Sequence, residues 1–535
     1  MLRTELGPHA SAVSDAWRRA GDAGLAGRLR ASDPSAFGGH AEGAAPWIGW
    51  LRAPLEMRAY THDLGAFARA CREDGITHAI VLGMGGSSLC PEVSRLTYGR
   101  GLGIELRVLD STDPAAVAAA GRGLDPARTL HIVASKSGTT VEPLAFMAHF
   151  WARAEAALGA AEAGRRFVAI TDPETPLGDD ARERGFRAVL ENPADIGGRY
   201  SALSLFGLLP MALLGVPLDP LLDRAQAALA ADAGPRLGVA LAALAEAGRD
   251  KVTVLADPAV DSIGLWVEQL VAESLGKEGL GLVPVAEEPA GDADAFGPDR
   301  TFVYHRMTGH RDADVAALTA AGHPVLTLEL RDTLDLGAIY MTWELATAAA
   351  GATLGVNPFD QPDVQAAKDA TNAVLARLER GEEAEDQREP PEALAGQLGA
   401  LAPGDYLALL AFCPPSPAAD RALAGIRALV RTRTGAATTA GYGPRFLHST
   451  GQLHKGGPPS GVFVQLLSED PEDLPVPGKP YTFGQLKRAQ ALGDADALAA
   501  RGRRLLRVGL GPDAPAGLRA AEAALAHDPS PVTGG

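Results

Sequence analysis

The chain has 535 residues, 46% of them apolar and 21% charged, and carries a formal net charge of −17. This length exceeds what one hydrophobic core can hold, so we expect roughly two or three domains in a globular protein of ordinary composition. The negative charge argues against a general nucleic-acid-binding protein, which needs a basic face. Cys71, Cys90 and Cys413 are scattered along the chain, a pattern that indicates neither a disulfide framework nor a metal cluster.

The sequence contains no segment typical of export or of membrane insertion. No apolar run of the kind found in secretion signals follows Met1. The longest apolar stretch, 202–217, is interrupted by Gly207, Pro210 and Gly215 and is short for a membrane span, so it predicts a buried, kinked helix. We therefore expect a cytoplasmic protein that binds neither membranes nor nucleic acids.

Strand-like runs alternate with helical ones, which predicts βαβ units and parallel sheets. The predicted strands are 77–84, 104–110, 130–135 and 166–172, then, after a helical stretch at 221–247, 251–257, 281–285, 301–306 and 324–330, and finally 406–412, 461–467 and 505–509. The fold class is therefore α/β, with two doubly wound parallel-sheet domains and a C-terminal α/β block.

The chain order also suggests domain boundaries. We predict an N-terminal helical segment (1–50), a first domain (51–235), a second domain (236–380), a linker (381–404), the C-terminal block (405–527) and a disordered tail (528–535).

The first predicted strand enters a glycine-rich turn, Gly83-Met84-Gly85-Gly86-Ser87-Ser88. Glycines let the backbone approach a bound anion closely, so this turn favours a phosphate, although a tight strand-to-helix turn is the plain alternative. Ser88 stands where a dinucleotide fingerprint has Gly or Ala. Asp110, at the end of the next strand, nevertheless falls about where a ribose-binding acid would stand.

A hydroxyl-rich loop, Ser135-Lys136-Ser137-Gly138-Thr139-Thr140, follows the strand at 130–135. Its hydroxyls, its backbone N–H groups and the start of the next helix all favour an anion, with simple helix capping by Ser137 or Thr139 as the alternative. Two such loops at neighbouring strand ends favour one monophosphate over a dinucleotide. The predicted phosphate-binding residues are Gly85, Gly86, Ser87, Ser135, Lys136, Ser137, Thr139 and Thr140.

Three further motifs follow in chain order: Gly197-Gly198-Arg199-Tyr200-Ser201, Glu273-Ser274-Leu275-Gly276-Lys277 and Phe359-Asp360-Gln361-Pro362. With the two loops, this order resembles the glucose-6-phosphate isomerase family over residues 45–380. The resemblance implies that the two doubly wound domains are sugar isomerase (SIS) domains. The segment 441–457 resembles the isomerase half of transaldolase/glucose-6-phosphate isomerase fusion proteins. No transaldolase portion is found in the sequence, so we expect this chain to correspond to the isomerase half alone.

The resemblance implies an aldose–ketose isomerase that interconverts glucose 6-phosphate and fructose 6-phosphate through a cis-enediol, in glycolysis and gluconeogenesis. It implies a sugar-phosphate substrate, no metal or other cofactor, and a homodimer. The chemistry needs a carboxylate base, a cation beside the enediolate oxygen and a phosphate anchor. Glu273 is the candidate base and Arg199 the candidate cation, while Glu268, on another face of the same predicted helix, is assigned a structural role.

The family also places a substrate-contacting Gln and a catalytic Lys at Gln361 and Lys368. These positions lie about two helical turns apart on one face of a predicted helix. The family's ring-opening histidine is missing from the corresponding loop, 285–300. Ring opening would then rely on Lys368 alone or on a histidine from elsewhere in the same or a partner subunit, with His305, His448 and His454 as the candidates.

Other interpretations remain open at this stage. A phosphosugar-binding regulator would need the phosphate loops but not Glu273, Arg199 and Lys368 together. An isomerase of another phosphosugar, such as mannose 6-phosphate, would share all of these features. A nicotinamide-dependent dehydrogenase is supported only by the glycine-rich turn and Asp110.

Overall fold

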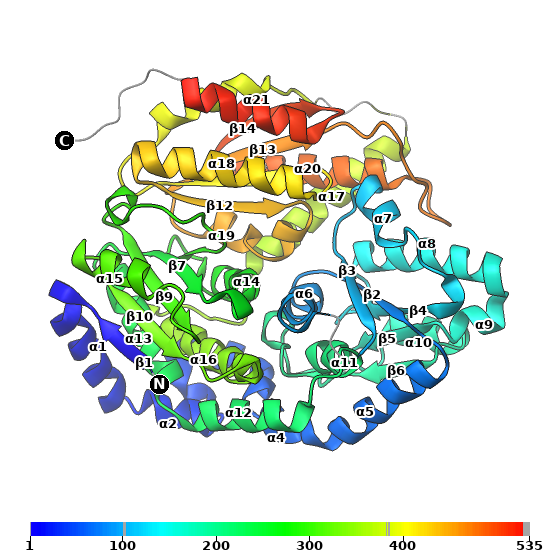
Figure 1. The fold of residues 1–535 in the computed structure, drawn as a ribbon, viewed down its shortest axis with the longest axis horizontal. Helices are drawn as coiled ribbons and strands as arrows, with labels where there is room; N and C mark the ends of the chain where they lie inside the picture. Colours follow the sequence, from blue (N-terminus) through cyan, green and yellow to red (C-terminus); the bar gives the residue numbers. More distant parts are fainter. Residues whose placement is uncertain (1, 100–102, 381, 383–385, 528–535) are drawn as a thin grey trace.

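The computed structural model describes residues 2–99, 103–380, 382 and 386–527, without the side chains of 364–369, 372, 378 and 379. The described residues form three sheets flanked by helices (Figure 1). In Figure 1 the first sheet lies on the right, the second on the left and the third above both. The predicted α/β class with parallel sheets is confirmed.

The first sheet is parallel throughout, in the order β3-β2-β4-β5-β6. Its strands are β2 (His78–Gly83), β3 (Glu105–Leu109), β4 (Thr129–Ala134), β5 (Phe167–Thr171) and β6 (Ala188–Glu191). The helices of this region are α5 (Arg58–Glu73), α6 (Gly86–Tyr98), α7 (Pro114–Ala120), α8 (Val141–Leu158), α9 (Ala160–Gly164), α10 (Pro176–Glu183) and α11 (Leu205–Leu213). Every residue of β4 and β5 is buried, as expected for strands covered on both faces. The sequence predicted β2 to β5 but missed β6, a short and partly exposed edge strand.

The second sheet has the order β1-β10-β9-β7-β8. Its strands are β1 (Leu2–Glu5), β7 (Lys251–Ala256), β8 (Val283–Val285), β9 (Arg300–Arg306) and β10 (Val325–Glu329). Its helices are α12 (Leu218–Ala230), α13 (Ala233–Glu246), α14 (Ile263–Leu275), α15 (Asp312–Ala320) and α16 (Leu336–Leu354), and α1 (Ala10–Asp22), α2 (Leu25–Arg30), α3 (Ala41–Ala44) and α4 (Ala53–Glu56) precede them. The N-terminal segment (1–50), predicted as helical, therefore also contains a strand. Residues 2–5 pair antiparallel with β10, because the open edge of that strand offers unpaired backbone groups.

The third sheet is parallel, in the order β12-β11-β13-β14. Its strands are β11 (Tyr406–Phe412), β12 (Ala437–Tyr442), β13 (Gly461–Ser468) and β14 (Arg504–Gly511), with α17 (Pro362–Glu379), α18 (Pro417–Thr434), α19 (Gly451–Gly456), α20 (Phe483–Ala500) and α21 (Ala514–His527) around it. Two short 3₁₀ helices matter below: η6 (Gly198–Tyr200) in the first domain and η11 (Arg445–His448) in the third. The sequence missed β12, whose Thr- and Gly-containing run carries little apolar signal.

Two predicted boundaries shift in the structure. Residues 391–400, inside the predicted linker, form the 3₁₀ helix η10 (Pro391–Ala400), which buries Leu394 and Leu398 in the core of the third domain. Helix α17, assigned to the second domain, packs along α20 of the third. The predicted tail 528–535 lies outside the described residues.

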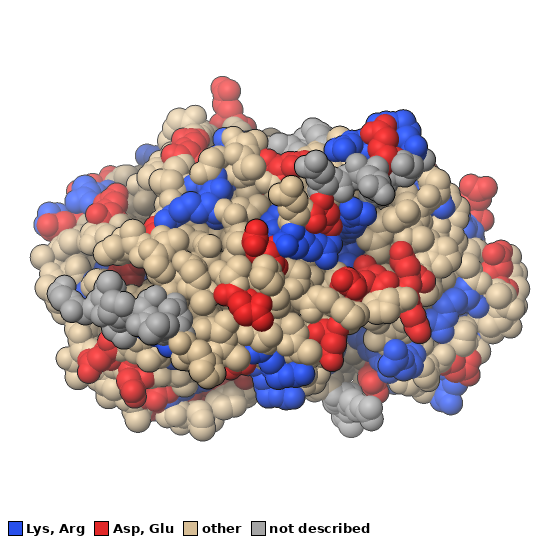
Figure 2. All heavy atoms as spheres, turned by 90° about the horizontal axis from the view of Figure 1, so that it is seen from above, with Lys and Arg blue, Asp and Glu red and all other residues tan. Residues whose placement is uncertain are grey.

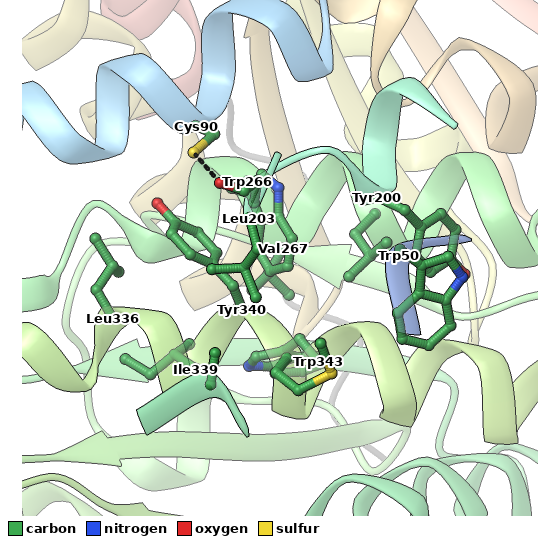
Figure 3. Packing of buried hydrophobic residues seen from close by; sticks show 14 of the residues in the cluster. Trp50, Cys90, Tyr200, Leu203, Trp266, Val267, Leu336, Ile339, Tyr340 and Trp343 are labelled. Carbon is green, nitrogen blue, oxygen red and sulfur yellow. Dashed lines mark hydrogen bonds between the residues drawn. The ribbon is translucent and has the colours of Figure 1, made fainter. Parts of the chain in front are cut away.

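The largest apolar core joins the N-terminal region to the first and second domains. Figure 3 shows Trp266, Tyr340 and Trp343 packed between α14 and α16, with Trp50 against Tyr200. The rings of Trp50 and Tyr200 stack with their centroids 5.0 Å apart. Because Tyr200 belongs to the Gly-Gly-Arg-Tyr-Ser motif, this packing fixes the backbone that presents its arginine.

The predicted buried helix at 202–217 is present as α11, every residue of which is buried, with Pro210 inside it. No single helix in the described part of the chain is long and apolar enough to cross a membrane. Helices α12 and α13, which are bent by 57° relative to each other, reach the required length and apolar composition only when they are taken together. Basic and acidic side chains are interspersed over the face that Figure 2 shows.

A buried ion pair of the second domain lies against the third domain. Arg300 of β9 donates two hydrogen bonds, of 2.9 and 2.8 Å, to the carboxylate of Glu288, and a third, of 2.8 Å, to the hydroxyl of Thr253. From the third domain, the Thr438 hydroxyl donates to Glu288 at 3.4 Å and the Ala436 carbonyl accepts from Arg300 at 3.4 Å. Glu288, in the loop 285–300, therefore contributes to the packing of the second domain against the third.

We predict that Glu288→Ala lowers the free energy of unfolding by about 3 kcal/mol, because it leaves the Arg300 guanidinium buried without a counter-charge. Urea unfolding followed by circular dichroism measures the change. The control is Asp15→Ala, which removes the partner of Arg18 in an exposed ion pair and should leave the unfolding curve unaltered. Equal curves for both variants would contradict the prediction.

Candidate active site

The glycine-rich turn connects β2 to α6 and packs directly against the Gly-Gly-Arg motif. Gly85 has φ +55°, a left-handed conformation that favours glycine. A Cβ on Gly86 would lie 1.9 Å from the carbonyl oxygen of Gly198. Glycine is therefore required here for the contact of two backbones, and Ser87 sits almost fully buried at the start of α6.

The hydroxyl-rich loop connects β4 to α8 and is held by its own side chains. The Ser135 hydroxyl donates to that of Thr140 at 3.2 Å, and the hydroxyls of Ser137 and Thr139 lie 3.0 Å apart. Thr140, the N-cap residue of α8, makes no side-chain hydrogen bond to the helix. The first N–H groups of this 18-residue helix are therefore not satisfied by their N-cap side chain, which favours an anion at this end.

Lys136 connects the hydroxyl-rich loop to neighbouring segments of the protein. Its ammonium pairs with Asp172, donates to the Ala194 carbonyl at 2.9 Å and lies 5.4 Å from the centre of the Trp47 ring. The ammonium of Lys136 is thus engaged by protein groups, and its predicted contact with the phosphate stays a prediction.

Arg199 and Glu273 form the centre of the site. Arg199, 4% exposed, lies in η6, and its Nη1 is 3.0 Å from Oε1 of Glu273 in the last turn of α14. Its Nε donates to the Ser274 hydroxyl at 2.9 Å, and its Nη1 also donates to the side-chain oxygen of Gln361. The structure therefore brings together three residues that the sequence proposed separately: Arg199, Glu273 and Gln361.

The turn that presents Gln361 is held by two buried cations. Arg199 Nη2 donates to the carbonyls of Pro358 and Asp360 at 2.9 and 3.0 Å. Lys277 donates to the carbonyls of Asn357 and Asp360, and to the Asp360 carboxylate, each at 2.6 Å. Burial, with a smaller contribution from the neighbouring Arg199, lowers the pKa of Lys277 to about 8. Sequence motifs gave no role to Lys277, although it closes the motif that contains Glu273.

Gln269 is a site residue that the sequence analysis missed. Its Nε2 donates to Glu273 Oε2 at 2.9 Å and to the main-chain carbonyl of His448 at 2.8 Å. Its only sequence signal is the spacing of four residues to Glu273, which places both on one face of α14. Gln269 thus connects the candidate base to the third domain.

Two of the candidate histidines are packed away from the site. His305 is fully buried in β9, where its Nδ1 bonds to the Leu255 carbonyl at 3.1 Å and its Nε2 accepts from Trp343 at 2.8 Å. Burial lowers its pKa to about 4. His454 is buried against Phe463, and burial holds its pKa well below the usual range. Neither ring has the access that proton transfer to a substrate requires.

His448 lies at the site. A Cβ on Gly85 would come within 3.3 Å of its Cβ, and its carbonyl bonds to Gln269, the neighbour of Glu273. Its Nε2 is 2.9 Å from Oε1 of Glu142, which follows the hydroxyl-rich loop in α8. A residue of the third domain therefore stands beside the glycine-rich turn of the first and the candidate base of the second; α14, which carries that base, contacts both α6 and α19 and lies between them in Figure 1.

Two further assignments follow from the contacts. Both carboxylate oxygens of the buried Asp110 accept from Arg445 at 2.8 Å, so this side chain is not open to a ribose as a dinucleotide site requires. Among the described residues, no group of three His, Cys, Asp or Glu side chains could hold a metal ion. Lys368 falls in α17, which begins next to Gln361, but its side chain lies outside the described residues.

Comparison with known proteins gives a consistent picture. The family model described as phosphoglucose isomerase matches residues 55–227. The glucose-6-phosphate isomerase of Rubrobacter xylanophilus is 32% identical over 391 residues, which cover 62% of this chain and 89% of that protein. The enzyme of the same name from Thermus thermophilus is 29% identical over 385 residues, covering 62% and 90%.

Solved structures share the fold. A hypothetical protein from Thermus thermophilus superposes with a TM-score of 0.59 at 26% identity, covering 70% of this chain and 100% of that one. A glucose-6-phosphate isomerase from Chlamydia trachomatis superposes with a TM-score of 0.53 at 20% identity, covering 63% and 75%, and this likeness concerns the fold alone.

Proposed function

Because the chain belongs to the phosphoglucose isomerase family, we propose that it interconverts glucose 6-phosphate and fructose 6-phosphate. The observation that carries this function is the buried pair of Arg199 and Glu273, 3.0 Å apart beside the glycine-rich turn. A regulator that only binds a phosphosugar has no use for a base and a cation in contact. The pair therefore favours an isomerase.

The phosphate of the sugar is proposed to bind between the two loops. The hydroxyls of Ser135, Ser137, Thr139 and Thr140 and the N-terminus of α8 supply donors, and the turn at Gly85, Gly86 and Ser87 closes the other side. An anchored phosphate holds the reacting carbons still, which converts binding energy into orientation. No cofactor is required by this chemistry.

Glu273 is proposed to carry the proton between the two reacting carbons. Starting from the ketose, its carboxylate removes a proton from C1, the electron pair moves to the C2 carbonyl oxygen, and a cis-enediolate forms. A proton then moves from the C1 hydroxyl to the C2 oxygen, so that the negative charge lies on the C1 oxygen. Returning the first proton from Glu273 to C2, as the C1 carbonyl forms, completes the aldose. The guanidinium of Arg199 lies 3.0 Å from the Glu273 carboxylate and remains charged throughout, so it can stabilise the negative oxygen of the intermediate. Gln361, bonded to Arg199, is proposed to contact the substrate from the start of α17.

Ring opening is proposed to use His448. Opening a cyclic sugar moves one proton from the anomeric hydroxyl to the ring oxygen, and an imidazole can both accept and donate it. Glu142 Oε1 holds the Nε2 of His448 and so orients the ring. Lys368, predicted by the family to assist, belongs to the helix that starts at the site.

We predict that Glu273→Gln lowers kcat by about a thousandfold or more, within the range that general-base catalysis contributes. A coupled assay with fructose 6-phosphate as the substrate measures the rate. A parallel assay with mannose 6-phosphate as the substrate tests the alternative phosphosugar. The matched control is Glu268→Gln, five residues earlier on α14. Burial raises the pKa of Glu268 to about 8, so a neutral amide closely mimics its state near pH 7. Full activity in Glu273→Gln, or equal loss in both variants, would exclude Glu273 as the base.

His448→Asn should slow turnover of fructose 6-phosphate by about a hundredfold, since it removes a group that moves a proton during ring opening. Proton exchange into a four-carbon aldose 4-phosphate, which cannot close a ring, should be unchanged. His62→Asn, an exposed change on α5, serves as the control. If His448→Asn impairs both substrates equally, or neither, ring opening does not use this histidine.

A further inference from the structure

The loop after β3, residues 110–113, is buried beneath the third domain. Its side chains bind that domain at three points: both oxygens of Asp110 accept from Arg445 at 2.8 Å, Thr112 Oγ1 donates to Gln490 Oε1 at 2.7 Å, and Asp113 Oδ2 accepts from Lys487 at 2.8 Å. We name residues 110–113 the docking loop. The three contacts fix the third domain on the first in one orientation.

Arg445 is connected to His448 by a short, rigid stretch of backbone, so the position of Arg445 sets the position of His448. Both residues lie in η11, a single short 3₁₀ helix, with Arg445 at its first position and His448 at its last. A bidentate pair between a guanidinium and a carboxylate fixes direction as well as distance. The position of Asp110 therefore determines where the imidazole of His448 enters the site.

Gln490 is linked to the same imidazole through the carboxylate of Glu142. It lies in the buried interior of α20, and its Nε2 donates to Oε1 of Glu142 at 2.7 Å, the same oxygen that lies 2.9 Å from His448 Nε2. The Thr112 hydroxyl donates to the amide oxygen of Gln490, so the NH₂ group must face Glu142. A chain of hydrogen bonds thus runs from the docking loop through Gln490 and Glu142 to the imidazole.

We propose that Arg445 and Gln490 are positioning residues for ring opening, which act on His448 through the docking loop and through Glu142. This inference rests on the proposed function and deepens it. The third domain, on this view, completes the active site by placing one imidazole against the other two domains. Neither Arg445 nor Gln490 touches the sugar.

The kinetic test compares Gln490→Leu and Arg445→Met with a matched control, Gln465→Leu. Gln465 is a fully buried glutamine of β13 that bonds to Asp494 and to the Ala491 carbonyl. Misalignment of the imidazole should lower kcat on fructose 6-phosphate by about 10- to 100-fold and leave KM within about twofold. Exchange into the four-carbon aldose 4-phosphate should stay within about twofold of wild type. Arg445→Lys should recover part of the loss, because it retains one charged contact to Asp110.

A second readout does not depend on activity. In protein labelled with ¹⁵N-histidine, the ring signals of His448 should move in Gln490→Leu and Arg445→Met, while those of His305 and His454 stay in place. Gln465→Leu should lower the melting temperature without moving the His448 signal or the ratio of rates on the two substrates.

The outcomes separate the two proposals. If wild type lacks isomerase activity but the His448 signal moves in both variants, the proposed function fails while the docking role stands. If wild type is active and neither the His448 signal nor kcat changes in Gln490→Leu and Arg445→Met, the positioning role is overturned. Equal losses of rate on ring-closed and open-chain substrates, matching those of Gln465→Leu, would likewise show that Arg445 and Gln490 have only a structural role.

Discussion

The buried ion pair between Arg199 and Glu273 is the interaction on which the site depends. It joins η6 of the first domain to α14 of the second, so it closes the boundary between two sheets. Burying two charges costs on the order of several kcal/mol per ion, which is offset only where hydrogen bonds satisfy the remaining atoms. Here Ser274, Gln361 and two backbone carbonyls satisfy the guanidinium, and Gln269 satisfies the carboxylate. Such a pair specifies one arrangement of the two domains, and that arrangement places the proposed base beside a cation.

The third domain depends on the same arrangement. Its histidine can reach the site only because the docking loop and α14 already stand in fixed positions, the first holding Arg445 and the second holding the His448 carbonyl through Gln269. On our account each domain supplies one element of the chemistry: the first the phosphate anchor and the arginine, the second the base, and the third the imidazole. Catalytic groups drawn from three domains are positioned by domain packing as much as by local structure.

The fold class and the candidate centre of the site could be predicted from the sequence, because strands, helices and turns have local signals and the family motifs stand in chain order. A glycine turn after a strand, or a carboxylate near a helix end, shows itself within about ten residues. Residues defined by tertiary contact were not readable. Gln269 resembles any polar residue of a helix, and the choice of His448 among three histidines follows only from how the third domain docks. Asp110 stood where a ribose-binding acid would, yet its partner is Arg445, 335 residues later. Edge strands such as β1 and β6 were missed because half-exposed strands carry a weak apolar pattern.

We propose that one carboxylate moves a proton between C1 and C2 of a sugar phosphate held by the two loops. The most direct measurement runs the conversion of fructose 6-phosphate in D₂O and follows C2 of the aldose product by proton NMR. We expect a fraction of the product to carry deuterium at C2, because the proton held by Glu273 can exchange with solvent before it is returned. Full turnover with no deuterium at C2 would rule out the step proposed here, in which the proton held by Glu273 exchanges with solvent before it is returned.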